Sequence, residues 1–150
     1  MFGFGSKKIL YFPGCFTSLV LPEIVANYNK IFNKLKLEVH FLPKEVCCGA
    51  VAHSNGYTTD FEELKQRALG VFSNSNIKNI ITNSADCLSV LTWKYGFKVW
   101  HVTQLLAQYT KKFPVMHDEE VNYYDPIALR IYSEPRAILN SLGFLMIIVV

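Results

Sequence analysis

The residues in this sequence that are best suited to chemistry are its four cysteines, Cys15, Cys47, Cys48 and Cys87. Thiolates are soft ligands, and four of them complete either a tetrahedral zinc site or a cubane iron–sulfur cluster. The apolar run at the start of the sequence is too short for a signal peptide, so we expect a reducing, cytoplasmic location. In that setting four cysteines predict a metal site more readily than two disulfides.

The spacing of the cysteines favours a cluster over a single ion. There are 31 residues between Cys15 and Cys47 and 38 between Cys48 and Cys87. Structural zinc sites usually space their ligands two to four residues apart, whereas a cluster offers each of two adjacent thiolates a different iron. Gly49 follows the cysteine pair and would let the backbone turn tightly and donate an amide to a sulfur. Ordinary buried cysteines are the alternative, because a free cysteine behaves as a small apolar residue.

The elements that must position these cysteines alternate between strands and helices. Apolar and β-branched runs predict strands over 8–12, 37–42, 77–82, 99–102, 121–124 and 144–150, the last one buried, and helical spacing predicts helices over 22–35, 59–72, 88–93, 103–111 and 135–143. This order predicts an α/β fold, Rossmann-like, with a mainly parallel sheet covered by helices. Each cysteine segment follows a predicted strand, so the cysteines should meet at the carboxyl edge of the sheet.

Charge and hydropathy exclude several kinds of partner. The net charge of +3 comes from scattered residues, with no basic run that would follow a phosphate backbone, so nucleic acid is not an expected partner. The terminal apolar run 144–150 is too short to span a bilayer. No direct membrane span is therefore expected.

Three further residues are candidates for supporting roles. Ser84, three residues before Cys87, either caps a helix or donates a hydrogen bond to a cluster sulfur. His53 either lies near the metal, as a ligand or proton carrier, or is a solvated loop histidine. For His101 an internal structural hydrogen bond is the preferred interpretation.

Three motifs, YFPGC, LPKEVCCGAVAHSNGY and ITNSADC, together resemble the CCG-domain (cysteine-rich) family. That family is typified by a component of heterodisulfide reductase and by iron–sulfur subunits of glycolate and glycerol-3-phosphate oxidation complexes. Its pattern is a cysteine, then Cys-Cys-Gly, then Cys-x-x-Cys, and Ser84 here replaces the first cysteine of the last motif. The segments YYDP and EPRAILNSLG resemble the opening of a second repeat, in which Ile127 and Ala128 replace the usual Cys-His.

The resemblance implies a CCG domain over residues 1–113 and a truncated start of a second repeat over 114–150. It implies that Cys15, Cys47, Cys48 and Cys87 bind an iron–sulfur cluster, of the 4Fe-4S type, with zinc as the alternative, and that Ser84, His53 and Gly49 surround these ligands. The expected function is an electron-transfer subunit of a heterodisulfide reductase-like or dehydrogenase complex, an oxidoreductase subunit that is not catalytic alone. Its partners would be other redox subunits, one of which could hold it at the membrane periphery. A redox-inert zinc scaffold and a metal-free truncated paralogue are the alternatives.

Overall fold

The computed structural model describes residues 8–42, 44–73, 79–116 and 119–149. The chain divides into two compact units, residues 1–100 and 101–150, and each is described here by itself. The domain boundary that the sequence suggests after residue 113 stays a prediction. Among the described residues, no helix combines the length and the apolarity that a bilayer crossing requires.

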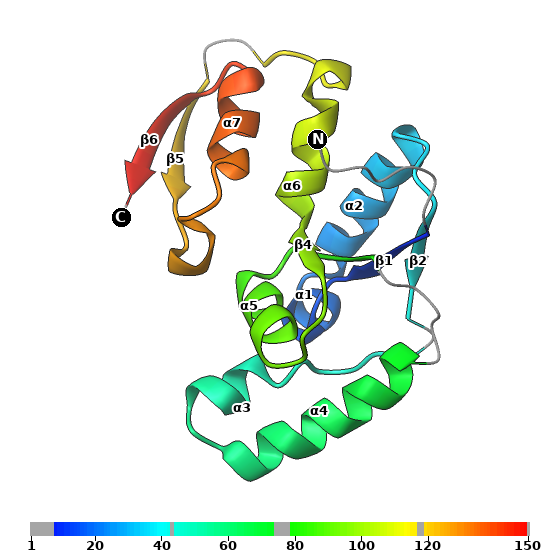
Figure 1. Cartoon of the computed structure of the whole chain (residues 1–150). Coiled ribbons are helices and arrows are strands. Elements are labelled where there is room, and N and C mark those ends of the chain that lie inside the picture. The colour runs from blue at the N-terminus through cyan, green and yellow to red at the C-terminus, as the bar shows by residue number, and fades with distance from the viewer. Residues whose placement is uncertain (1–7, 43, 74–78, 117–118, 150) are drawn as a thin grey trace. The chain divides into compact units, whose positions relative to one another are not determined.

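A four-stranded sheet with the order β2-β1-β3-β4 lies in the first unit, apart from the last residue of β4. Its strands are β1 (Ile9–Phe12), β2 (Val39–Phe41), β3 (Asn79–Thr82) and β4 (Val99–His101). Figure 1 shows its strands β1 and β2 side by side. The central strand β1 pairs in parallel with both neighbours, so that Leu10 lies opposite His40 on one side and Ile80 on the other. The predicted α/β class with a parallel sheet is thus confirmed, although residues 77 and 78 of the predicted third strand lie outside the described residues.

Helices cover both faces of this sheet. They are α1 (Cys15–Val20), α2 (Pro22–Lys34), α3 (Ala50–Ser54), α4 (Thr58–Ser73) and α5 (Ala85–Trp93). Successive side chains of a strand point to opposite faces, and Tyr11 packs edge-on against Phe32 of α2 at 5.3 Å between ring centroids. Its neighbour Phe12 packs against Phe72 of α4 at 5.6 Å. Because α2 and α4 lie on opposite faces, every residue of β1 is buried.

The second unit is a smaller βαβ arrangement. It contains α6 (Val102–Leu106), the 3-10 helix η1 (Ala107–Lys112), β5 (Glu120–Tyr124), the 3-10 helix η2 (Ile127–Leu129), α7 (Glu134–Ser141) and β6 (Leu145–Val149). Strands β5 and β6 pair in parallel. The expectation that the terminal strand is buried is wrong, since Leu145 is 60% exposed and Ile147 and Ile148 are each 47% exposed. A two-stranded sheet with one crossover helix cannot cover both of its faces.

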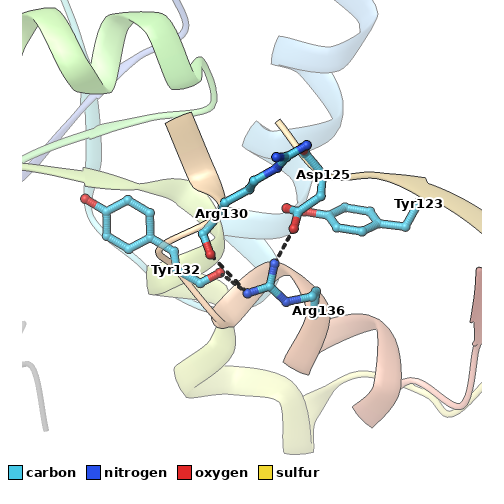
Figure 2. Close-up of polar contacts among 5 residues, drawn as sticks. All are labelled: Tyr123, Asp125, Arg130, Tyr132 and Arg136. Atoms are coloured by element: carbon cyan, nitrogen blue, oxygen red, sulfur yellow. Dashed lines mark hydrogen bonds and ion pairs between the residues drawn. The ribbon is translucent and has the colours of Figure 1, made fainter. Parts of the chain in front are cut away.

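A buried carboxylate organises the loop between β5 and α7. Asp125 is 6% exposed, and its carboxylate accepts hydrogen bonds from the guanidinium of Arg136 and, at 3.3 Å, from the hydroxyl of Tyr123. Figure 2 shows the same guanidinium reaching two backbone carbonyls, those of Arg130 at 3.3 Å and Tyr132 at 3.1 Å. Arg136 therefore ties the carboxylate and the loop backbone together.

His101 caps helix α6. The backbone N–H of Thr103 donates to Nδ1 of His101 at 3.4 Å, and the backbone N–H of His101 donates to the side chain of Gln104 at 2.9 Å. These reciprocal bonds form a capping box. The predicted structural hydrogen bond of His101 is confirmed.

Candidate metal centre

The four cysteines come from three separate segments of the chain and line one cavity. Cys15 is the first residue of α1, Cys47 and Cys48 lie in the loop between β2 and α3, and Cys87 lies in the first turn of α5. The sulfurs of Cys15 and Cys47 are 3.7 Å apart, and those of Cys48 and Cys87 are 3.1 Å apart. The cavity that all four line has a volume of about 290 Å³ and lies beyond the carboxyl ends of β1 and β3.

Two glycines allow the backbone to pass close to these sulfurs. Gly14 has a φ of +80°, and a Cβ at this position would lie 3.0 Å from the Cys87 sulfur. Gly49 has a φ of +77°, and its N–H donates to the Cys47 sulfur at 3.4 Å. An L-residue with a side chain adopts this left-handed backbone only with strain. Both turns therefore depend on glycine, as the sequence suggested for Gly49.

Gly49→Ala is expected to destabilise the protein by about 1–3 kcal/mol, because the left-handed φ adds strain and the new methyl group would clash. The added Cβ would lie 2.8 Å from a ring carbon of Phe61. Urea unfolding followed by circular dichroism measures the loss. Gly56→Ala is the matched control, since Gly56 has a φ of +78° but no atom within 4 Å of the added Cβ. Equal losses in the two variants would contradict the packing argument.

The paired thiols differ in acidity. The hydrogen bond between the Cys48 and Cys87 sulfurs lowers the pKa of Cys48 and, together with burial, raises that of Cys87. Burial and the hydrogen bond with Cys47 raise the pKa of Cys15 to about 11. Burial, together with the nearby cysteine charges, also raises the pKa of Tyr95. The surroundings thus favour a thiolate first at Cys48.

Ser84 holds Cys87 in place. Its hydroxyl accepts a hydrogen bond from the backbone N–H of Cys87 at 3.2 Å, as the N-cap of α5. Its own N–H donates to the hydroxyl of Thr82 at 3.1 Å. The N-cap interpretation of Ser84 is confirmed, and the same side chain lines the cysteine cavity.

Ser84→Ala should cost about 1 kcal/mol of stability, the usual loss for an N-cap serine, while leaving metal content unchanged. The variant removes the acceptor of the Cys87 N–H and a hydroxyl that lowers the pKa of Cys87, but no thiolate. Thermal unfolding and metal analysis of the same preparation test both parts. Ser89→Ala, an exposed change on the same helix, should alter neither the stability nor the metal content. Loss of metal without loss of stability would instead assign Ser84 to the metal centre.

Two residues that the sequence did not single out support the site. The hydroxyl of Tyr95 donates to the carbonyl of Cys48 at 3.0 Å and so fixes the backbone of the cysteine pair. The side chain of Asn83 accepts from the Tyr11 hydroxyl at 2.8 Å and donates to Thr17 of α1 at 3.1 Å. Asn83 lies within the ITNSADC motif, but its role and that of Tyr95 escape local patterns because each contact joins positions far apart in the sequence.

His53 lies apart from the sulfurs. It is in α3, its side chain is exposed, and its ring packs edge-on against Phe61 at 5.0 Å. His53 is not among the described residues that line the cysteine cavity. This placement fits a solvated histidine better than a metal ligand.

The sulfurs form two pairs and not one compact group. In the described part of the chain, no three His, Cys, Asp or Glu residues are arranged to hold one metal ion. A single tetrahedral zinc would need every sulfur–sulfur separation to be close to about 3.8 Å, given zinc–sulfur bonds of about 2.3 Å. An iron–sulfur cluster binds its thiolates at separate irons and does not require them to meet at one point. Four thiolates are a donor set that fits a cubane cluster or a zinc ion.

Comparison with known families identifies the domain that contains these cysteines. The family model described as CCG, cysteine-rich domain, matches residues 9–92, a stretch that includes all four cysteines. The chain belongs to the CCG family. The resemblance inferred from the motifs is thus confirmed, and the CCG match covers the sheet strands β1 to β3 and the helices that carry the cysteines.

Curated relatives of this CCG domain are similar over the same part of the chain. One component of the anaerobic glycerol-3-phosphate dehydrogenase of Escherichia coli is 29% identical over 96 residues, which is 59% of this chain and 23% of that protein. The probable glycolate oxidase iron-sulfur subunit of Bacillus subtilis is 26% identical over 87 residues, 57% of this chain and 19% of that protein. Lactate utilization protein A of Bacillus velezensis is 23% identical over 83 residues, 55% of this chain and 34% of that protein. The chain therefore matches about a third or less of the length of these relatives.

Proposed function

We propose that this chain binds an iron–sulfur cluster, of the 4Fe-4S type, through Cys15, Cys47, Cys48 and Cys87. The observation that carries the proposal is that four cysteines from three separate segments of the chain line a single cavity. The family match covers all of them, and one relative is named an iron–sulfur subunit. When bound, such a cluster takes up and releases single electrons.

The surrounding residues suit a cluster site. The Gly49 N–H already donates to the Cys47 sulfur, and donors of this kind tune the potential of a bound cluster. The Tyr95 hydroxyl fixes the Cys48 carbonyl, so that the adjacent pair keeps its direction. Cys48 and Cys87 are 3% and 5% exposed, which keeps water away from the inner half of the site.

We further propose that the chain works as an electron-transfer subunit of a larger dehydrogenase or heterodisulfide reductase-like complex. Two relatives are named as subunits of an oxidase or dehydrogenase. Phe16 and Val51 line the cysteine cavity and are 65% and 72% exposed, so an apolar rim surrounds the site. Exposed apolar side chains around a site are typical of a protein contact surface, and here they would bring a partner close to the metal.

Anaerobic reconstitution with iron and sulfide tests the cluster. We expect about four irons and four sulfides per chain, visible sulfur-to-iron charge-transfer absorption, and reversible bleaching by dithionite with an electron paramagnetic resonance signal. A colourless protein that retains one zinc per chain would contradict the proposal and favour a structural zinc scaffold. Folded protein that retains neither metal would contradict both and favour the metal-free alternative.

One specific observation makes zinc the second candidate. The sulfurs of Cys15 and Cys47 are 3.7 Å apart, close to the edge of a tetrahedral thiolate site. Ser84 also stands where the family pattern has a further cysteine, which leaves four thiolates, the number that zinc requires. The metal analysis above separates the two candidates.

A further inference from the structure

A second cavity lies beside the cysteine cavity. We call it the β1–β2 pocket; it has a volume of about 460 Å³ and is lined by residues of β1, α1, α2 and the end of β2 with the loop that follows. Pro13 and Gly14 line both cavities, so the two adjoin along this segment. Its volume lies in the range of small-molecule sites in proteins, which is roughly 300–1,000 Å³.

Aromatic rings form one wall of the β1–β2 pocket. Phe41 of β2 contributes to it and is 43% exposed, although it packs edge-on against Tyr11 at 5.6 Å. Tyr11 is fully buried and its hydroxyl donates to Asn83, so Phe41 supplies the accessible ring of this wall and Tyr11 packs behind it. Such a wall favours a flat apolar ring that can pack against it in an offset or edge-on arrangement.

Three polar side chains line the wall, and two of them, Asn29 and Glu45, are exposed. They are the hydroxyl of Ser18, the carboxamide of Asn29 and the carboxylate of Glu45, from α1, α2 and the loop after β2. In the described part of the chain none of these side chains makes a hydrogen bond or ion pair. An apolar pocket with a few convergent polar groups is the usual form of a ligand site.

The charge of the pocket restricts the ligand. Glu45 is the one charged residue among the described residues of the wall, and no Lys, Arg or His accompanies it. An ionised carboxylate accepts hydrogen bonds and repels another anion. We propose that the β1–β2 pocket binds a small aromatic ring compound that carries a hydroxyl donor and no negative charge. Glu45 would accept a hydrogen bond from the hydroxyl, and the ring of Phe41 would contact the aromatic face.

This inference goes beyond the proposed function and does not depend on it, since none of the four cysteines lines the β1–β2 pocket. The test uses two probes of matched shape, 2-naphthol and 2-naphthoate, with the full chain at neutral pH and ligand-observed NMR or calorimetry as the readout. We expect 2-naphthol to bind at least about tenfold more tightly than 2-naphthoate, a difference of about 1.4 kcal/mol. In Glu45→Gln the two affinities should come within about threefold of each other.

A matched pair of variants tests the location. Val25→Trp fills the pocket and should weaken 2-naphthol binding at least about tenfold, whereas Val20→Trp, at a position 57% exposed and outside the pocket, should leave it unchanged. Equal binding of the two probes to the unchanged chain, or an equal response of the two tryptophan variants, would overturn the proposal. If Val25→Trp does not fold, the comparison of probes in Glu45→Gln still decides it. None of these measurements depends on bound metal. A negative result for the β1–β2 pocket would therefore leave the cluster proposal unaffected, and a negative result for the cluster would leave the pocket proposal unaffected.

Discussion

Cys48→Ser is expected to abolish cluster binding, lowering the iron content from about four atoms to less than about one per chain. Cys48 is 3% exposed and its sulfur lies 3.1 Å from that of Cys87 at the inner end of the cavity. A serine hydroxyl stays protonated near neutral pH and is a poor ligand for iron, so the variant removes one of four donors without changing the shape of the site. Iron and sulfide analysis after anaerobic reconstitution measures the effect.

The control for Cys48→Ser is Ser84→Ala, because Ser84 lines the same cavity but supplies no thiolate. Circular dichroism of both variants without metal should match that of the unchanged chain, which separates loss of a ligand from loss of folding. Full iron content and an unchanged electron paramagnetic resonance signal in Cys48→Ser would remove Cys48 from the ligand set. The other three cysteines would then have to hold the cluster with a donor from elsewhere.

Sequence reasoning located the strands and the longer helices because their signals are local. The central strand β1 is a short run of β-formers that ends at Pro13-Gly14, and α2 begins at Pro22 and follows a helical apolar pattern. Helices α1 and α3 span only six and five residues, too few for a periodic pattern to be visible. Their N-cap residues are Gly14 and Gly49, so their starts depend on glycines with positive φ and not on apolar spacing.

The convergence of the cysteines followed from topology, whereas their detailed pairing did not. A parallel sheet brings the ends of its strands to one edge, which is enough to expect Cys15, Cys47 and Cys87 near each other. Which sulfurs pair, and the support that Tyr95 gives to the Cys48 carbonyl 47 residues away, depend on side-chain packing that no local pattern encodes. The burial of β6 was misjudged for a related reason, since apolar composition predicts a strand but not how many neighbours will cover it.

Asp125→Ala is expected to destabilise the second unit by about 3 kcal/mol, because it leaves the guanidinium of Arg136 without its carboxylate partner. Asp125 is 6% exposed and the side chain of Arg136 is 26% exposed, so water replaces the lost partner poorly. The Arg136 guanidinium also holds the carbonyls of Arg130 and Tyr132, and these bonds should loosen when its position is no longer fixed (Figure 2). Urea unfolding gives the total loss, and hydrogen exchange of residues 119–149 should locate it.

Two further variants separate the contribution of the Asp125–Arg136 ion pair to stability from that of the Tyr123 hydrogen bond. Tyr123→Phe removes only the 3.3 Å hydrogen bond to Asp125 and should cost no more than about 1 kcal/mol. Asp125→Asn keeps the shape and one acceptor oxygen, so its cost should fall between those of the other two changes. If Asp125→Ala lowers the free energy of unfolding no more than Tyr123→Phe does, the ion pair does not contribute to stability. The graded order would instead show that a buried carboxylate, and not the apolar surface of β6, fixes the loop that joins β5 to α7.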